Sequence, residues 1–170
     1  MAPKIIYIEW EGPYAFGDME EFDDENCDYG LYQIYGRHPL YGKEVLLYVG
    51  ITEEQTFARK LELEEEDWDL EVGFDQLSIY LGYLAGEKTP TAEVWGQEID
   101  QAARLLVYVH NPIHNARPLA AELDPDLKDL HVINQGDYQD LQPEVSAARF
   151  LVNIADLDEY DLYGRHGIKE

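Results

Sequence analysis

Two tyrosines, each close to a glycine, are the first candidates for catalytic residues in this chain. They lie in two short, β-like segments, Gly30-Leu31-Tyr32 and Tyr48-Val49-Gly50. If these segments form neighbouring strands, the two phenols can converge on one water molecule and help to activate it. Gly30 and Gly50 would let the backbone lie close to such a site, because no Cβ stands in the way. Cross-strand aromatic packing is the alternative, since strands favour tyrosine in any case.

The elements that would position these tyrosines follow from local patterns. The segment 36–44, "GRHPLYGKE", holds two glycines and a proline, so it predicts the loop of an antiparallel hairpin. Further strands are expected at residues 5–10, 76–84 and 130–136, where β-branched and other apolar residues gather.

Two helices are expected to flank these strands. Residues 52–55, "TEEQ", match a capping box and predict a helix that starts at Thr52 and ends in solvent along the acidic run "ELEEEDWD". A second helix is expected over 92–110, with Thr91 as its N-cap and Pro112 closing it. Residues 146–157 suggest a further, short helix.

The order of these elements fits the α+β class or a three-layer α/β mixture around a small sheet. We favour the α+β class, with a small mixed or antiparallel β-sheet flanked by helices and a C-terminal β/α extension. The length of 170 residues, of which 45% are hydrophobic, favours one domain with a full core. Within it we distinguish an N-terminal strand and acidic segment (1–29), a core (30–115) and the extension (116–170).

Charge limits the partners of the chain. Its 36 Asp and Glu residues against 12 Lys and Arg residues give a net charge of −24, which repels a polyanion over about 8–10 Å near physiological salt. Three explanations of this acidity are a salt-rich host, an acidic surface without a role, and imitation of DNA. The acids are spread along the chain, which disfavours the third.

The single Cys27 and the lack of a long apolar run or signal peptide predict a cytoplasmic protein without a membrane partner.

Four pieces in order resemble the GIY-YIG nuclease family over residues 30–115. They are "GLY" (30–32), "YVG" (48–50), an arginine in the helix that follows, and the segment from Pro112 to Asn115 after the second helix. The resemblance implies hydrolysis of DNA phosphodiesters with Mg²⁺ or Mn²⁺. It makes Tyr32 the general base or its relay, Tyr48 its positioning partner, and Arg59 the group that stabilises the charge at phosphorus. Asn115 would fix the loop or touch the phosphate.

One expected ligand of the metal is missing. In the family, a glutamate on the second helix binds the cation, about nine residues before the closing proline. Counting back from Pro112 reaches Ala103, which cannot bind a cation. Asp100, one turn earlier on the helix, is the nearest substitute, and Glu98 is the alternative if an insertion shifts the register.

Two functions therefore remain open. The first is a metal-dependent endonuclease, which a nucleic acid would approach through basic residues near the site: Arg37, Lys43, Arg59 and Lys60. The second is a catalytically inactive module that binds a protein partner, acts as an anti-nuclease or imitates DNA. Ala103 and the charge of −24 favour the second.

Overall fold

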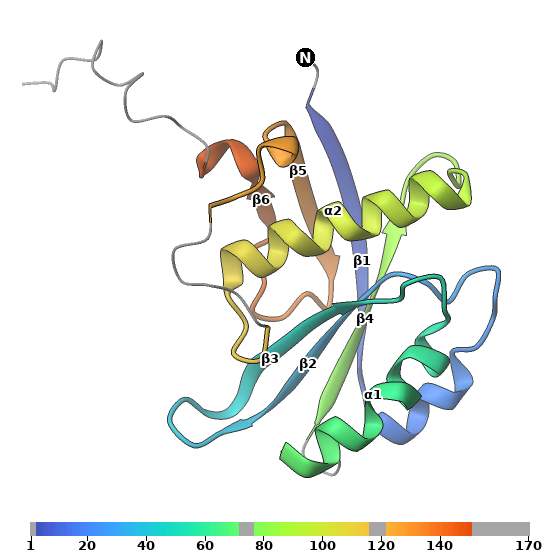
Figure 1. Ribbon diagram of the computed structural model, residues 1–170, viewed down its shortest axis with the longest axis vertical. Coiled ribbons are helices and arrows are strands. Elements are labelled where there is room, and N and C mark those ends of the chain that lie inside the picture. Colours follow the sequence, from blue (N-terminus) through green and yellow to red (C-terminus); the bar gives the residue numbers. More distant parts are fainter. Residues whose placement is uncertain (1–2, 72–76, 116–121, 151–170) are drawn as a thin grey trace, which may run out of the picture.

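A single six-stranded mixed β-sheet organises the computed structural model, which describes residues 3–71, 77–115 and 122–150 (Figure 1). Across the sheet the strands follow the order β3-β2-β4-β1-β5-β6. Their bounds are β1 (Lys4–Tyr14), β2 (Leu31–His38), β3 (Gly42–Ile51), β4 (Ser78–Ala85), β5 (Leu130–Gly136) and β6 (Glu144–Ser146). The expected α+β class with a mixed sheet and flanking helices is confirmed.

The hairpin predicted from the two tyrosine segments is present as β2 and β3. The two strands pair antiparallel, with Tyr32 opposite Gly50 and Ile34 opposite Tyr48. The register then shifts, because Leu46 rather than Leu47 lies opposite the next residue of β2. This irregularity adds one residue to β3, as a β-bulge does.

The C-terminal extension completes the same sheet. β1 lies between β4, which pairs with it antiparallel, and β5, which pairs with it in parallel from Lys4 opposite Leu130 to Trp10 opposite Gly136. Figure 1 shows β5 and β6 beside β1, far from the hairpin. β5 covers the residues that the sequence predicts.

Two helices, α1 (Phe57–Glu71) and α2 (Ala92–His110), pack on opposite faces of the sheet. Alternate residues of β2 show this: Tyr32 and Ile34 pack in one apolar cluster with α1, whereas Leu31 and Tyr35 pack in another with α2. The α1 side includes Phe57, Leu61 and Trp68, and the α2 side includes Ile99, Ala102, Leu105 and Leu106. Each face of the hairpin therefore has its own environment.

The predicted bounds of α2 are confirmed. The Thr91 hydroxyl accepts a hydrogen bond from the Val94 N–H at 3.5 Å, and Asn111 closes the helix with a left-handed backbone just before Pro112. Three short 3₁₀ turns complete the described structure: η1 (Phe16–Glu21), η3 (Pro125–Leu127) and η4 (Ala147–Arg149).

Two predicted helix bounds are wrong. α1 begins at Phe57 rather than Thr52, because the buried Thr52 hydroxyl accepts a hydrogen bond from the Gly30 N–H at 2.9 Å and so secures the end of the hairpin. The helix expected at 146–157 is replaced at its start by the end of β6 and by η4, and residues 151–157 lie outside the described part. None of the described helices is long and apolar enough to cross a membrane.

Candidate functional site

Tyr32 and Tyr48 lie together on the face of the sheet that α1 covers. Their ring centroids are 6.0 Å apart, and the Tyr48 ring also meets Trp68 of α1 edge-on at 5.7 Å. The pairing explains this closeness, because Tyr48 lies opposite Ile34 and is thus a diagonal neighbour of Tyr32 on one face. The two phenols converge as the sequence suggests.

A carboxylate and an ammonium group from α1 complete this cluster. The Tyr32 hydroxyl donates a hydrogen bond to Glu64 Oε1 at 2.7 Å, and Lys60 Nζ lies 3.6 Å from the same oxygen. Lys60 also reaches Glu53 at 4.0 Å. We call Tyr32, Tyr48, Lys60 and Glu64 the phenol cluster.

Sequence reasoning missed Glu64, which was expected to lie in solvent with the rest of its acidic run. Its side chain is only 19% exposed. The signal was available: Glu64 follows Phe57 by seven residues and Leu61 by three, so it lies on the apolar stripe of α1 that faces the sheet. A single acid on such a stripe needs a buried partner, and Tyr32 supplies it.

The Tyr32 hydroxyl is enclosed and poorly suited to accept a proton from water. The side chain has no exposed surface. Burial, reinforced by the nearby Glu64 carboxylate, raises the pKa of Tyr32 far above its ordinary value. Burial and Glu64 also raise the pKa of Tyr48, although that side chain is half-buried. Both phenols are therefore held protonated at neutral pH.

The two glycines of the motif make room for packing. A Cβ on Gly50 would collide with the ring of Tyr32, and a Cβ on Gly30 would collide with the backbone carbonyl of Gly82 on β4. Gly50 thus allows the phenol to lie flat across β3, and Gly30 allows β2 and β4 to approach. The expected close approach is present, and it serves the Tyr32 ring and a neighbouring strand.

The Arg59 side chain lies apart from the phenol cluster, beside two carboxylates. Its guanidinium pairs with Asp23 at 3.2 Å and with Glu25 at 2.9 Å, and its side chain is 53% exposed. The hydrogen bond to Glu25 and the charge of Asp23 raise its pKa. Arg59 follows Phe57 by two residues, about 200° around the helix, so the buried Phe57 turns it outward. The cation beside the phenols is Lys60.

Asn115 closes the exposed edge of the sheet. Its side-chain amide accepts a hydrogen bond from the Val49 N–H at 3.0 Å and donates one to the Val49 carbonyl at 2.9 Å. The adjacent His114 N–H donates to the Leu47 carbonyl at 2.8 Å. Asn115 therefore fixes the local loop, one of its two expected roles, by satisfying the backbone of an edge strand.

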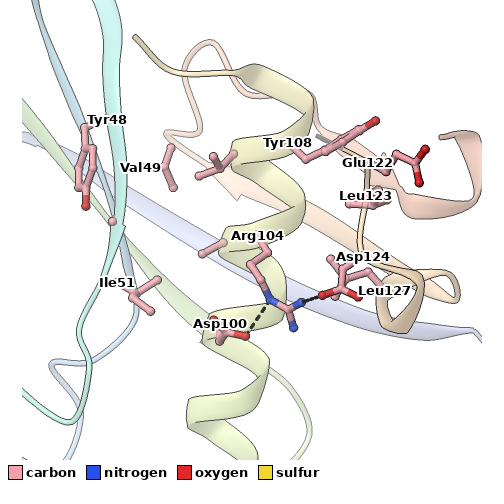
Figure 2. A pocket seen from close by; sticks show the side chains of 13 residues that line it. Tyr48, Val49, Ile51, Asp100, Arg104, Tyr108, Glu122, Leu123, Asp124 and Leu127 are labelled. Carbon is pink, nitrogen blue, oxygen red and sulfur yellow. Dashed lines mark hydrogen bonds and ion pairs between the residues drawn. The ribbon is translucent and has the colours of Figure 1, made fainter. Parts of the chain in front are cut away.

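The candidate metal ligands lie on the other face of the sheet. Asp100 accepts a hydrogen bond from Arg104 at 2.9 Å, and Arg104 also pairs with Asp124 and Asp126. Figure 2 shows Asp100 and Arg104 in a cavity between α2 and β3, with the Tyr48 ring beyond the strand. Ala103 is buried in that α2 cluster, and Glu98 lies 3.5 Å from Lys4.

This arrangement does not fit the Mg²⁺ or Mn²⁺ that the resemblance implies. Asp100 and Glu98 are each held by a cation of the chain, and the sheet separates α2 from the phenol cluster. Among residues 3–71, 77–115 and 122–150 no three His, Cys, Asp or Glu side chains are arranged to hold a metal ion.

The four basic residues expected around one site are dispersed. Arg37 and Lys43 line a hollow of about 290 Å³ at the far end of the β2–β3 hairpin. Arg59 pairs with acids on the outer side of α1, and Lys60 belongs to the phenol cluster. The Tyr32 hydroxyl donates a hydrogen bond to Glu64, but its side chain has no exposed surface on which a substrate could be attacked.

No family model, no curated protein and no solved structure matches this chain.

Proposed function

We propose that this chain is a catalytically inactive binding module, which keeps a GIY-YIG-like hairpin and first helix and captures a basic segment of a protein partner. The enclosed Tyr32 hydroxyl is the observation that carries the first half of this proposal. It has no exposed surface and donates to Glu64, so an attacking water and a phosphodiester cannot approach it without opening the core.

The distribution of the other expected groups supports the same conclusion. Arg59 is bound by two carboxylates, while Asp100 and Ala103 lie across the sheet from Tyr32. A phosphoryl-transfer site needs such groups within hydrogen-bond reach of one substrate. The rival candidate, an endonuclease, is favoured by one observation, the convergence of Tyr32 and Tyr48 on one face.

Charge supports a basic partner. The net charge of −24 attracts cations and repels nucleic acid, and it raises the rate at which a basic partner encounters the chain. The two guanidinium groups of Arg59 and Arg104 are each already paired with at least two carboxylates. They are poorly available for a phosphate backbone.

A plasmid-nicking assay tests the absence of catalysis. The wild type, Tyr32→Phe and Ala103→Glu are incubated with supercoiled DNA and Mg²⁺ or Mn²⁺, at low and at high salt. We expect no nicking from any of them. Nicking by the wild type that disappears in Tyr32→Phe would overturn the proposal, and nicking by Ala103→Glu alone would show that α2 does reach the phenol cluster.

A further inference from the structure

An acidic region away from the phenol cluster surrounds a cavity. The residues that resemble the GIY-YIG motif do not line this cavity. The cavity has a volume of about 510 Å³ and lies between the first turns of α2, the loop after β3 and the segment before β2. Its lining includes three glutamates, two aromatic residues and one glycine: Glu25, Glu54, Glu93, Tyr29, Trp95 and Gly96. We call it the aromatic cavity.

The charged side chains that line the aromatic cavity in the described structure are all carboxylates. No Lys, Arg or His is among the described residues that line it. Glu54 and Glu93 are exposed, and no ion pair in the described part of the chain involves either of them. Glu25 shows that a carboxylate of this lining can bind a guanidinium group, because that of Arg59 lies 2.9 Å from it.

The walls of the cavity suit a flat cation. Tyr29 and Trp95 meet edge-to-face, with ring centroids 5.8 Å apart, and both line the cavity. Aromatic faces attract Lys and Arg side chains within about 6 Å of the ring centroid. The planar guanidinium also stacks on such faces and binds a carboxylate with two parallel hydrogen bonds, which an ammonium cannot do.

Gly96 lines the cavity and leaves the space beside it unfilled. It lies inside α2, where glycine is less favourable than alanine by about 0.5–1 kcal/mol. Packing does not require it, because a Cβ at this position would meet nothing within 4 Å. A side chain longer than that of alanine would project into the free space at the cavity, so this position can be used to fill it.

We propose that the aromatic cavity binds an arginine side chain of a basic polypeptide. This inference rests on the proposed function and names the site at which the partner binds. Trp95 also lines a second hollow, of about 570 Å³, together with Ile5 and Tyr7, which are exposed. A polypeptide can place an apolar neighbour of the arginine there, whereas a small cation would leave it unused.

The test uses a labelled peptide of alternating arginine and glycine, and a matched peptide in which neutral citrulline replaces arginine. Affinity is measured by fluorescence anisotropy at about 0.15 M salt.

Gly96→Leu fills the cavity and is compared with Gly96→Ala, which makes the same helix-favouring change with a small side chain. The double variant E54Q/E93Q is compared with D137N/E144Q, which removes two exposed acids far from the cavity. Circular dichroism checks that every variant is folded.

We expect the wild type to bind the arginine peptide and not the citrulline peptide. Gly96→Leu and E54Q/E93Q should each weaken binding by about tenfold or more, while Gly96→Ala and D137N/E144Q should change it by less than about threefold. The indole N–H signal of Trp95, assigned in a ¹H–¹⁵N spectrum by its loss in Trp95→Phe, should move on titration while those of Trp10 and Trp68 stay.

Two failures can be told apart. If the wild type binds the arginine peptide but Gly96→Leu and E54Q/E93Q bind it equally well, the site is wrong and the binding module stands. If the wild type does not distinguish arginine from citrulline, the proposed function falls together with the site.

Discussion

The hydroxyl of Tyr32, near the start of β2, donates a hydrogen bond to Glu64 on α1 at 2.7 Å. This bond crosses from the sheet to the helix in a region where both side chains are largely buried. The other carboxylate oxygen of Glu64 is buried too and has no hydrogen-bond partner in the described structure. Tyr32 is therefore the main support of this carboxylate, with Lys60 as its neighbouring charge.

Tyr32→Phe should destabilise the fold. Loss of a hydrogen bond to a buried charged group costs about 1.5–3 kcal/mol, because the carboxylate keeps its desolvation penalty. For a chain of this length, each kcal/mol lowers Tm by about 2–4 °C, so denaturant and thermal unfolding should both report the change. Tyr41→Phe is the matched control, since Tyr41 is exposed, and it should alter stability by less than about 0.5 kcal/mol. Equal stability of Tyr32→Phe and the wild type would contradict this account of the cluster.

Two glycine-to-alanine substitutions should have opposite signs. Gly50→Ala places a methyl group against the Tyr32 ring and should cost about 1–3 kcal/mol. Gly96→Ala meets open space within α2 and should stabilise the chain by up to about 1 kcal/mol. Urea unfolding of both variants measures the difference, and a destabilised Gly96→Ala would mean that the space at α2 is not free.

Much of the fold can be predicted from local patterns, and the limits have physical causes. The bounds of α2 follow from the Thr91 cap and the apolar stripe, which act within one element. The start of α1 is missed because Thr52 bonds with Gly30, twenty-two residues away, instead of capping a helix. Local pattern cannot reveal such a partner.

The candidate site, too, is predicted where it depends on local pairing and is missed where it depends on distant elements. Tyr32 and Tyr48 meet because hairpin pairing is a local matter that the sequence specifies. The separation of Asp100 from them depends on which face of the sheet α2 covers, and that in turn depends on the insertion of β4 and β1 beside β2. No spacing along the chain encodes this choice of face.

The fold should lose stability in mild acid through His110. Its Nε2 accepts a hydrogen bond from the Gln142 N–H at 2.9 Å, while Nδ1 lies 2.9 Å from the Leu106 carbonyl, so the imidazole is neutral with its proton on Nδ1. Burial lowers the pKa of His110 below its ordinary value of 6.5, against the weaker opposing effects of the hydrogen bond to the Leu106 carbonyl and the charge of Asp140. The unfolded chain therefore binds the second proton, which makes the imidazole a cation, more tightly than the folded chain does.

The stability that the neutral His110 contributes to the fold is fully present above about pH 6.5. It is lost as the pH falls through the depressed pKa of the folded state. The measurement is the free energy of unfolding between about pH 7.5 and pH 5 for the wild type and His110→Gln. The difference between the two should shrink as the pH falls, because the variant cannot be protonated at this position. A difference that stays constant over the range would refute the assignment.

Asn115→Asp should loosen the edge of the sheet. An aspartate can accept from the Val49 N–H but cannot donate to the Val49 carbonyl, and its charge would face that oxygen. The cost should be about 1–3 kcal/mol, mostly from the unpaired carbonyl. Amide hydrogen exchange gives a local reading: the Val49 amide should exchange faster, whereas the amide of Ile8, in the centre of the sheet, should change only by the global loss of stability. Unchanged exchange at Val49 would show that the edge does not depend on Asn115.

The acidic surface of this chain is proposed to bind a basic polypeptide rather than a nucleic acid. One anisotropy titration of the wild type tests it most directly, with the arginine–glycine peptide and a labelled DNA duplex as alternative ligands at about 0.15 M salt. We expect saturable binding of the peptide and no binding of the duplex. Binding of the duplex in the absence of peptide binding would contradict it.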